Sequence, residues 1–534
     1  MDNDFRHFQS ICPDCGKPVP AEYIRYDDAI YIVRSCPQHG TARILASEDA
    51  EAFERWITFP SVTVPPRVFL TKGGDCPEAT ECPLHCGPCE NHLMTACCVL
   101  INVTERCNQH CPYCFAEAGE GGEETSVSKD PSLSVIERWL DRLVELGEER
   151  KFNIQLNGGE PTVRNDLQEI IRLCKEKGFE YVQLNTNGRK LADDVDYARA
   201  LKAAGLTTVF LQFDGIDDEV YKALRGEPLF DIKKSAIENC AAAGLPVTLV
   251  PTVLKNVNLS QVGAIIDFML DNVSVIKGVH FQPASFFGRK PDTRNESGDF
   301  DERVTMFSVM DEIEKQTDGR IKKTDLAPIS TGHPLCCFCA ALMKEKNGEL
   351  RPLSSGGSCC GPELDPLEIV RRDRDFVLNK WDVAEALADD SQSQGSRLTS
   401  CSLRDSFPVC NKDYANLQGT VGFSQRNPEP CDCDANHARP HDSGCCESQE
   451  TEHCDCDANH AKPHDSGCCD RATSFDEALA IFKNDTFTIS GMAFMDETNL
   501  DAERLRRCRV QIFSSDEKLI PFCGFYTLYN GRKL

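Results

Sequence analysis

Apolar and polar residues alternate along the central part of the chain with two different periods. Short apolar runs bounded by polar residues or glycine have the length and composition of buried strands. These runs cover 98–103, 152–156, 181–186, 208–213, 247–253 and 278–283. A helical period follows the first of them, at Ile136, Trp139, Leu140, Leu143 and Val144.

Further helices are predicted between these strands. Ser134 and Glu137 have the spacing of a capping box, which predicts a helix start at this point. Later helices are expected over 167–174, 193–204 and 260–271. Alternating strands and helices predict an α/β fold with parallel strands and right-handed crossovers. A partial or complete (β/α) barrel fits, with ligand-binding loops at the carboxyl ends of its strands.

The segments on both sides of this pattern are rich in cysteine. CDCDANHARPHDSGCC (431–446) recurs as CDCDANHAKPHDSGCC (454–469) and contains almost no apolar residues, so it does not build a packed core unaided. It is either a binder of soft metals or an insertion without a metal role. We predict six segments: a ribbon-like metal module (1–65), a cysteine-rich connector with an auxiliary cluster (66–97), the barrel (98–290), an α-rich region with auxiliary ligands (291–427), the disordered repeat insertion (428–470) and a C-terminal auxiliary-cluster segment (471–534).

The chain contains 31 cysteines in 534 residues. Disulfide frameworks are typical of short secreted chains, and the N-terminus MDNDFRHFQS lacks the features of a secretion signal. We therefore interpret the clustered cysteines as metal ligands in a cytoplasmic protein. Cys174 and Cys240 lie within helical patterns instead, and we expect them to be small buried hydrophobic residues.

Charge and hydropathy exclude several kinds of partner. The formal net charge of −27 repels phosphate, so nucleic acid is not an expected partner. The charge also opposes electrostatic binding to an anionic membrane, although peripheral contact through apolar residues stays open. Because the longest apolar runs are too short to cross a bilayer, we expect no transmembrane segment.

Three cysteines follow directly after the first predicted strand, in CNQHCPYC: Cys107, Cys111 and Cys114. Thiolates at this spacing on one loop reach three corners of an iron–sulfur cube and leave the fourth iron without a protein ligand. An open coordination position suits catalysis. The alternative is a structural metal site with a distant fourth ligand.

Glycine-containing motifs stand at the ends of the next three strands: NGGEP (157–161), TNG (186–188) and QFDG (212–215). Gly158 and Gly159 allow the backbone to approach a ligand closely, and Glu160 presents a carboxylate beside them. Each motif alone is typical of a simple turn. Their succession after the cysteine loop favours a ligand-binding site.

This combination resembles the radical S-adenosylmethionine (SAM) superfamily, whose cysteine loop carries an aromatic residue before the last cysteine, here Tyr113. The resemblance implies a catalytic 4Fe–4S cluster that binds SAM at its open iron, and an electron donor such as ferredoxin or flavodoxin. Cleavage of SAM then yields a 5′-deoxyadenosyl radical that removes hydrogen from an unactivated carbon. The resemblance also implies that the motif containing Gly158, Gly159 and Glu160 contacts SAM. Asn187 and Gln212 would lie near the ribose and methionine parts of SAM.

The connector contains a second trio with the same spacing: Cys82, Cys86 and Cys89. It lacks a GGE-like motif one unit downstream, and Cys76 offers a fourth ligand. We therefore predict a closed auxiliary cluster that relays electrons. Cys97 and Cys98 are alternative ligands.

The N-terminal module contains two short ligand pairs, Cys12 with Cys15 and Cys36 with His39. This spacing is typical of a tetrahedral ribbon-type metal site. Zinc and rubredoxin-like iron both accept sulfur-rich tetrahedral ligands, so the sequence leaves mononuclear zinc or iron open.

The C-terminal part offers more cysteines than one cluster needs. Cys508 and Cys523 lie in segments with regular hydrophobic patterns, and Cys336 is the third choice for an auxiliary ligand set. Several neighbours are either ligands or bystanders: Cys337, Cys339, Cys359 and Cys360. We expect one or two auxiliary 4Fe–4S clusters in total.

Nearly end to end, the chain resembles the cysteine-rich radical SAM branch that includes the archaeal tetraether lipid synthases, earlier described as class D pterin-methylating proteins. The matching segments are CPDC, CPQHG, CPLHCGPCENH, CNQHCPYC, NGGEPT, QFDG, GHPLC, RRCRV and IPFC. The His/Cys repeat departs from that pattern.

The resemblance implies first a lipid substrate, with two isoprenoid chains joined by a carbon–carbon bond. FQPASFFG (281–288) and VTLVPTVL (247–254) then either line an apolar channel or form ordinary barrel core. One alternative is a radical SAM methylase acting on a pterin-like small molecule. Another, from a different class, is a non-catalytic iron–sulfur electron carrier or metal store, which would not cleave SAM.

Overall fold

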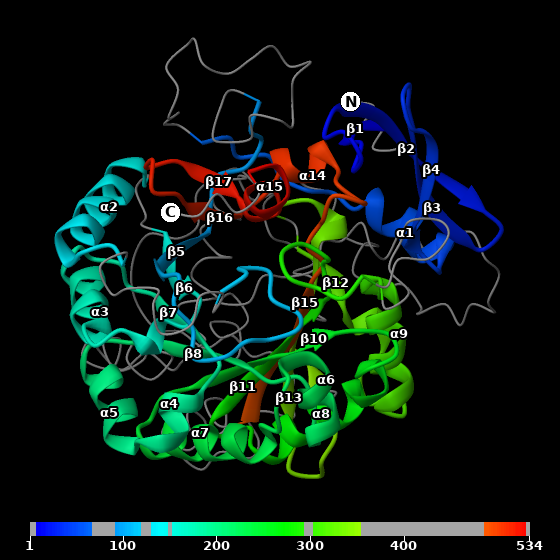
Figure 1. The fold of residues 1–534 in the computed structure, drawn as a ribbon. Coiled ribbons are helices and arrows are strands. Elements are labelled where there is room, and N and C mark those ends of the chain that lie inside the picture. Colours follow the sequence, from blue (N-terminus) through cyan, green and yellow to red (C-terminus); the bar gives the residue numbers. More distant parts are fainter. Residues whose placement is uncertain are drawn as a thin grey trace, which may run out of the picture.

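The structure is a computed structural model that describes residues 7–66, 91–118, 130–147, 152–292, 303–329, 331–353 and 485–529. These residues form a small N-terminal sheet beside a large curved sheet (Figure 1). In Figure 1 the helices of the central part lie along the outer side of the large sheet.

The N-terminal module is a four-stranded antiparallel sheet made of β1 (His7–Ile11), β2 (Pro18–Tyr26), β3 (Ala29–Cys36) and β4 (Gly40–Ser47). Helix α1 (Ala50–Ile57) follows, and the Asp49 carboxylate caps it by accepting from the backbone N–H of Ala52 at 2.9 Å. Trp56 of α1 meets Phe307 edge to face, with ring centroids 5.5 Å apart. Phe307 belongs to α9 (Met306–Gln316), so this contact joins the module to the main body.

The six predicted strands are present and pair in parallel, in the order of the sequence. They are β5 (Cys98–Thr104), β6 (Asn153–Gly158), β7 (Val182–Thr186), β8 (Thr208–Gln212), β9 (Val247–Val250) and β11 (Ile276–Pro283). The short β10 (Thr252–Val253) pairs with the end of β11. The connecting helices are α2 (Leu133–Leu146), α3 (Leu167–Glu176), α4 (Arg189–Asp193), α5 (Val195–Ala203), α6 (Asp218–Arg225), α7 (Phe230–Ala242) and α8 (Val262–Asp271). The predicted α/β fold with parallel strands is confirmed.

The C-terminal segment adds a strand to each edge of this parallel run. β15 (Thr486–Met492) pairs in parallel with β11, and β16 (Val510–Phe513) pairs in parallel with β5. Residues 493–509, which include α14 (Ala502–Arg506), therefore connect the two edges. The remaining elements of the large sheet and its end are β12 (Ala327–Pro328), β13 (Cys337–Lys344), β14 (Leu350–Pro352), β17 (Leu519–Pro521) and helix α15 (Phe522–Leu528).

The two faces of the large sheet differ in polarity. The face toward the helices is apolar and fully buried, as at Ile154, Leu184 and Leu211. The strand register places the intervening residues on the inner face, where polar and half-buried side chains gather. These include Asn102, Gln155, Asn185, Gln212, His280 and Ser490. Burial of the apolar face under the helices fixes the strand register and thereby the direction of the polar residues.

One sequence prediction needs correction, and another is only partly covered by the described residues. Helix α2 is capped by Ser132, whose hydroxyl accepts from the backbone N–H of Val135 at 3.4 Å; Ser134 already lies inside the first turn, so the Ser134–Glu137 capping box is wrong. The prediction that 291–427 is α-rich is not tested as a whole, because residues 354–427 lie outside the described residues; the described part contains α9, two short 3-10 helices and the strands β12, β13 and β14. These strands form because β15 offers an edge that β13 pairs with along its whole length.

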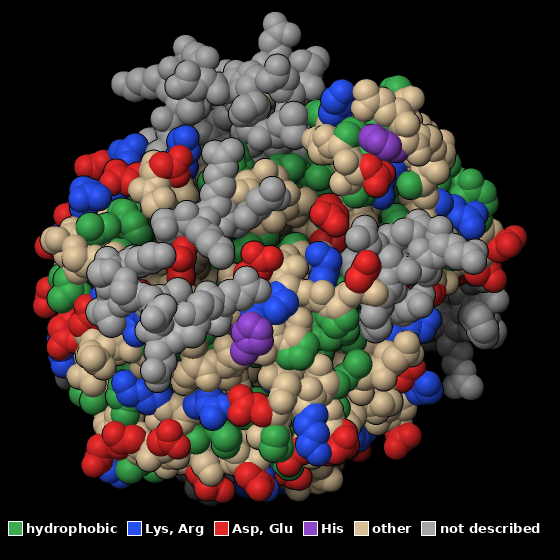
Figure 2. All heavy atoms as spheres, in the orientation of Figure 1, with side chains coloured by type: hydrophobic (Ala, Val, Ile, Leu, Met, Phe, Trp, Pro, Cys, Tyr) green, Lys and Arg blue, Asp and Glu red, His purple; other side chains and the backbone are tan. Residues whose placement is uncertain are grey.

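Other expectations agree with the structure. Cys174 and Cys240 are fully buried, and burial raises the pKa of each thiol to about 12. None of the helices in the described residues has the length and hydropathy needed to span a membrane. Figure 2 shows acidic and basic side chains interspersed over one face of the described part of the molecule.

Candidate functional site

The loop after β5 brings three cysteines toward the carboxyl ends of the strands. Burial, together with the charges of Glu160, Cys111 and Cys114, raises the pKa of Cys107 to about 12. These electrostatic interactions place the three thiols and Glu160 in one neighbourhood. Their sulfur atoms are not among the ligand groups that lie within 4.8 Å of one another in the described residues.

The GGE motif packs directly against the start of the cysteine loop. The backbone N–H of Gly159 donates to Thr104 O at 2.9 Å, and that of Glu160 donates to Arg106 O at 2.8 Å. A Cβ atom on Gly159 would lie 2.3 Å from Arg106 O, so only glycine permits this approach. The sequence predicted that these glycines admit a ligand. In the structure they also allow the GGE motif to pack closely against the start of the cysteine loop.

Glu160 links three of the predicted motifs. Its carboxylate is 1% exposed, and one oxygen accepts from the hydroxyls of Thr162 and Thr186 at 2.6 and 2.7 Å. The other oxygen accepts from the backbone N–H of Asn187 at 2.7 Å. Asn187 Nδ2 in turn donates to Asn108 Oδ1 of the cysteine loop at 2.7 Å. Glu160, Asn187 and the loop thus form one hydrogen-bonded unit.

A buried lysine that the sequence analysis missed connects Asn187 to Gln212. Lys233 of α7 is fully buried, and its Nζ donates to Asn187 O at 2.6 Å and to Gln212 Oε1 at 3.2 Å. Burial lowers the pKa of this ammonium group to about 8. A signal was present in the sequence, because Lys233 shares helical spacing with Phe230, Ile237 and Cys240 on the apolar side of α7.

A buried ion pair, also missed, supports the other end of the cysteine loop. Arg225 contacts both carboxylate oxygens of Asp214, at 2.7 and 2.8 Å, and Asp214 is fully buried. Arg225 Nη1 also donates to Tyr113 O at 3.3 Å. The QFDG motif therefore acts through Asp214 and Arg225 on the loop residue next to Cys114.

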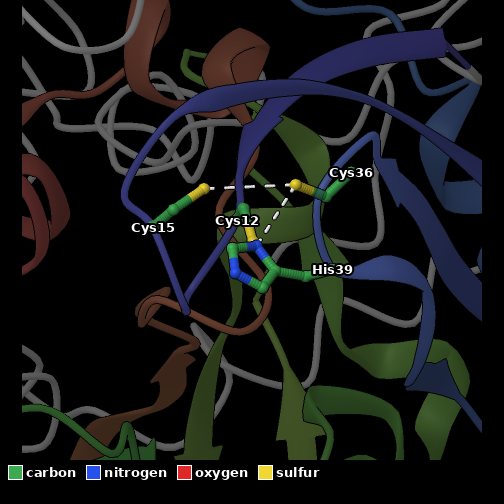
Figure 3. Close-up of side chains that lie close together, drawn as sticks. All are labelled: Cys12, Cys15, Cys36 and His39. Carbon is green, nitrogen blue, oxygen red and sulfur yellow. Dashed lines mark hydrogen bonds between the residues drawn. The ribbon is translucent and has the colours of Figure 1, made fainter.

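The N-terminal ligand pairs meet as expected. In Figure 3 the side chains of Cys12, Cys15, Cys36 and His39 converge, and their ligand atoms lie within 4.8 Å of one another. Cys15 Sγ is 4.0 Å from Cys36 Sγ, and His39 Nδ1 is 3.4 Å from Cys12 Sγ and from Cys36 Sγ. A tetrahedral ion with metal–sulfur bonds of about 2.3 Å separates its sulfur ligands by about 3.8 Å. The four ligand atoms fit a single tetrahedral ion.

Three cysteines from distant parts of the chain also come together. Cys336 precedes β13, Cys508 precedes β16, and Cys523 lies in α15. Burial raises the pKa values of Cys508 and Cys523, and the charges of the other cysteines raise them further. The backbone N–H of Met495 donates to Cys523 Sγ at 3.2 Å, and Arg504 Nε donates to Cys336 Sγ at 3.4 Å. Such donors suit thiolate ligands.

The remaining predicted ligands divide into two groups. Cys97, Cys98, Cys337 and Cys339 are described and half-buried. The others lie outside the described residues: Cys76, Cys82, Cys86, Cys89, Cys359, Cys360 and the repeat at 431–469.

The inner face of the sheet offers a polar surface beside the SAM motifs. Asn185 Nδ2 donates to Asn157 Oδ1 at 2.7 Å, and Asn157 Nδ2 donates to Asn102 Oδ1 at 3.2 Å. Across the sheet, His280 Nδ1 lies 2.9 Å from Ser490 Oγ, and its ring is 5.4 Å from that of Phe210.

The two segments considered for an apolar channel supply mostly core residues. Leu249 and Phe281 are fully buried in the core, whereas Thr248 lies on the inner face. The alternative that these segments are ordinary barrel core is confirmed for their strands.

Comparison with known proteins agrees with this geometry. Residues 101–269 match the model of the radical SAM superfamily, and residues 5–48 match that of the HMPTM N-terminal zinc ribbon domain. The chain is 31% identical to the 7,8-dihydro-6-hydroxymethylpterin dimethyltransferase of Methanocaldococcus jannaschii, over 97% of this chain and 93% of that protein. It is 32% identical to the GTP 3′,8-cyclase of Synechococcus elongatus, over 32% of this chain and 50% of that protein. The Fe-coproporphyrin III synthase of Methanosarcina barkeri is 33% identical, over 32% of this chain and 40% of that protein.

Proposed function

Because this chain belongs to the radical SAM superfamily, and within it to the family of the 7,8-dihydro-6-hydroxymethylpterin dimethyltransferase, we propose that it methylates a pterin-like small molecule. The similarity to that enzyme over 97% of the chain carries the proposal, because it includes the metal modules at both ends as well as the barrel. The comparisons favour this alternative over the joining of lipid chains, which was the first expectation from the sequence.

The inner face of the sheet supports a polar heterocycle better than a lipid. A pterin presents ring nitrogens, an amide and an amino group along a flat ring, and side-chain amides recognise such edges through hydrogen bonds. The connected amides of Asn102, Asn157 and Asn185 supply donors and acceptors, and the rings of Phe210 and His280 supply flat surfaces. Long alkyl chains would leave these polar groups unsatisfied.

We assign the SAM site to the unit built around Glu160. Cys107, Cys111 and Cys114 would hold the 4Fe–4S cluster, which supplies one-electron cleavage of SAM when bound. Glu160 would accept from the amino group of SAM, while Gly158, Gly159, Asn187 and Gln212 shape the surrounding backbone. Lys233 positions the last two residues through its hydrogen bonds to Asn187 O and Gln212 Oε1.

We assign two further metal sites to the described residues. Cys12, Cys15, Cys36 and His39 would hold a structural ion, and the match to a zinc ribbon favours zinc over iron. Cys336, Cys508 and Cys523 would hold an auxiliary iron–sulfur cluster. Electrons would reach the protein from a small donor such as ferredoxin or flavodoxin.

The decisive experiment follows the methyl group of SAM. The full chain, reconstituted with iron and sulfide without oxygen, is reduced with dithionite and given 7,8-dihydro-6-hydroxymethylpterin and SAM with a labelled methyl group. We expect 5′-deoxyadenosine and a pterin that carries the label. Replacement of Cys107, Cys111 and Cys114 by Ala should abolish both products while auxiliary iron remains.

Other outcomes would contradict the proposal in different ways. Formation of 5′-deoxyadenosine without labelled pterin, together with joined lipid chains in extracts of a host that expresses the gene, would establish the lipid synthase instead. Failure to cleave SAM at all would indicate an electron carrier. The variant His280→Ala should reduce pterin methylation while leaving SAM cleavage without pterin unchanged, because His280 is not part of the SAM unit.

A further inference from the structure

Arg504 is a buried cation with an unusual partner. Its side chain is 7% exposed, and its two hydrogen-bond acceptors are Cys336 Sγ, at 3.4 Å from Nε, and Ala493 O, at 2.6 Å from Nη2. Among the residues that the structure describes, carboxylates form no ion pair with Arg504 within 4.0 Å. The side chains of Arg225 and Arg303 are 8% and 7% exposed, and each contacts a fully buried aspartate, at 2.7 and 3.0 Å.

The carboxylate of Asp501 interacts with Arg504 electrostatically, but its hydrogen bonds go to other groups. Asp501 uses one oxygen to cap α14, where it accepts from the backbone N–H groups of Glu503 at 2.8 Å and Arg504 at 3.3 Å. Its other oxygen accepts from the Tyr23 hydroxyl of β2 at 2.8 Å. Asp501 therefore fixes the helix that carries Arg504 but does not form an ion pair with the guanidinium.

A guanidinium group stays protonated even when it is buried, and a buried charge without a counter-charge costs several kcal/mol. The sulfur of Cys336 is the acceptor that can carry a compensating negative charge. A neutral thiol would not do so, whereas a metal-bound thiolate would.

We propose that Arg504 is the counter-charge of the Cys336 thiolate and that it raises the reduction potential of the cluster held by Cys336, Cys508 and Cys523. This inference rests on the proposed auxiliary cluster. Hydrogen bonds to ligand sulfur and nearby positive charge stabilise the reduced, more negative form of a cluster. Arg504 is thus a positioning residue that makes this auxiliary site easier to reduce.

The N-terminal module is hydrogen-bonded to the segment that carries Arg504. Tyr23 and Asp501 are both buried, and their hydrogen bond joins β2 to the cap of α14. Arg34 of β3 also donates to Thr498 O, three residues before Asp501. The ribbon module therefore holds the short helix from which Arg504 reaches the sulfur.

The test measures the potential of this cluster in the full, anaerobically reconstituted chain. A background with Cys107, Cys111 and Cys114 replaced by Ala removes the SAM cluster, and the signal of interest is identified by its loss in Cys336→Ala. In Arg504→Met we expect the iron to be retained and the equilibrium constant for reduction to fall at least tenfold, about 59 mV for one electron. In Arg504→Lys the reduction potential should stay close to that of the original chain, because lysine keeps the positive charge.

Arg506→Met is the matched control. Arg506 lies on the same helix but donates to Asn91 O and pairs with Glu503, so its removal should leave the potential unchanged. An unchanged potential in Arg504→Met with the cluster retained would overturn the inference. If Arg504→Met loses the cluster, the substitute test is Tyr23→Phe, which removes the hydrogen bond to Asp501 at the start of α14. A lowered reduction potential of the auxiliary cluster in Tyr23→Phe supports the inference, and an unchanged potential contradicts it. If Cys336→Ala removes neither iron nor a signal, the auxiliary site itself is wrong, which is a separate failure.

Discussion

The rings of Phe115 and Phe522 meet edge to face, with centroids 5.7 Å apart. Phe115 follows Cys114 directly, and Phe522 directly precedes Cys523, so one aromatic contact joins the SAM loop to the helix of the C-terminal cysteine trio. Tyr526 reinforces it, with its ring 5.0 Å from that of Phe115. The two proposed cluster sites are therefore mechanically connected through packed aromatic side chains.

We expect Phe522→Ala to weaken cluster retention at the SAM loop although residue 522 is far from that loop in sequence. The substitution removes the contact with Phe115 and leaves a cavity, at a cost of about 3–5 kcal/mol for a buried phenylalanine. The measurement is the rate at which a chelator removes iron from the SAM cluster. Phe525→Ala is the control, because Phe525 lies on the same helix and contacts Tyr526 but not Phe115. Equal rates in the two variants would contradict the prediction.

Gly159→Ala should disturb the cysteine loop directly. Its Cβ would lie 2.3 Å from Arg106 O, and overpacking of this kind typically costs about 1–3 kcal/mol. We expect loss of iron from the SAM site and loss of 5′-deoxyadenosine formation. Gly244→Ala offers a comparison, since it has a positive φ of 66° but no neighbouring atom within 4 Å. It should lower stability through backbone strain alone and keep its iron; full iron content in both variants would argue against the role of Gly159.

Removal of a ligand from the ribbon site should unfold the N-terminal module. SAM cleavage should persist, because the proposed SAM site lies in the barrel. Cys15→Ser is expected to lose one metal ion per chain in elemental analysis, because a structural tetrahedral ion contributes much of the folding free energy of such a module. Cys240→Ala, at a buried cysteine outside the metal sites, should keep the full metal content. A Cys15→Ser protein with unchanged metal content would show that these four residues do not bind the ion.

Acid should destabilise the protein through His92. This side chain is 2% exposed, and burial, followed by the charge of Arg506, lowers its pKa from 6.5 to about 4. Between these two values the unfolded chain binds the proton more readily than the folded chain, so the free energy of unfolding falls as the pH decreases. The full difference corresponds to about 3 kcal/mol.

His92→Asn should reduce this pH dependence. Denaturant titrations at about pH 7.5, above the window of about 4 to 6.5, and at about pH 4.5, near its lower end, measure the loss of stability in each protein. We expect the original chain to lose more stability than the variant on acidification. Identical losses would show that His92 does not titrate in this way.

Short-range patterns predicted the fold and two of the sites. The ribbon ligands meet because each pair is separated by only two residues and the pairs lie at adjacent turns of one antiparallel sheet. The GGE motif could be recognised because glycine is required locally: Gly159 lies too close to Arg106 for any side chain. The parallel strands could be predicted because each is a short run rich in apolar residues and bounded by polar residues or glycine.

Long-range partners were beyond the reach of such patterns. Arg225 pairs with Asp214, and Arg504 donates to Cys336. The residues of each pair lie in different elements, and no helical or strand repeat in the sequence relates them. Lys233 differs, because a lysine on the apolar side of α7 is visible in the sequence even though its acceptors are not. The strands β15 and β16 were missed for the same reason as the ion pairs: their partners β11 and β5 lie far away in the chain.

The position of β15 and β16 at opposite edges has a consequence for biosynthesis. During translation, β5 to β11 leave the ribosome long before residues 485–529, so both edge strands of the nascent sheet lack these partners until that segment has been synthesised. Exposed strand edges invite misassembly, and a chaperone is the usual protection against it. Cys336 is likewise synthesised before Cys508 and Cys523, so the proposed auxiliary cluster can be inserted only after that later segment has been synthesised, whereas the loop containing Cys107 is available to the assembly machinery earlier.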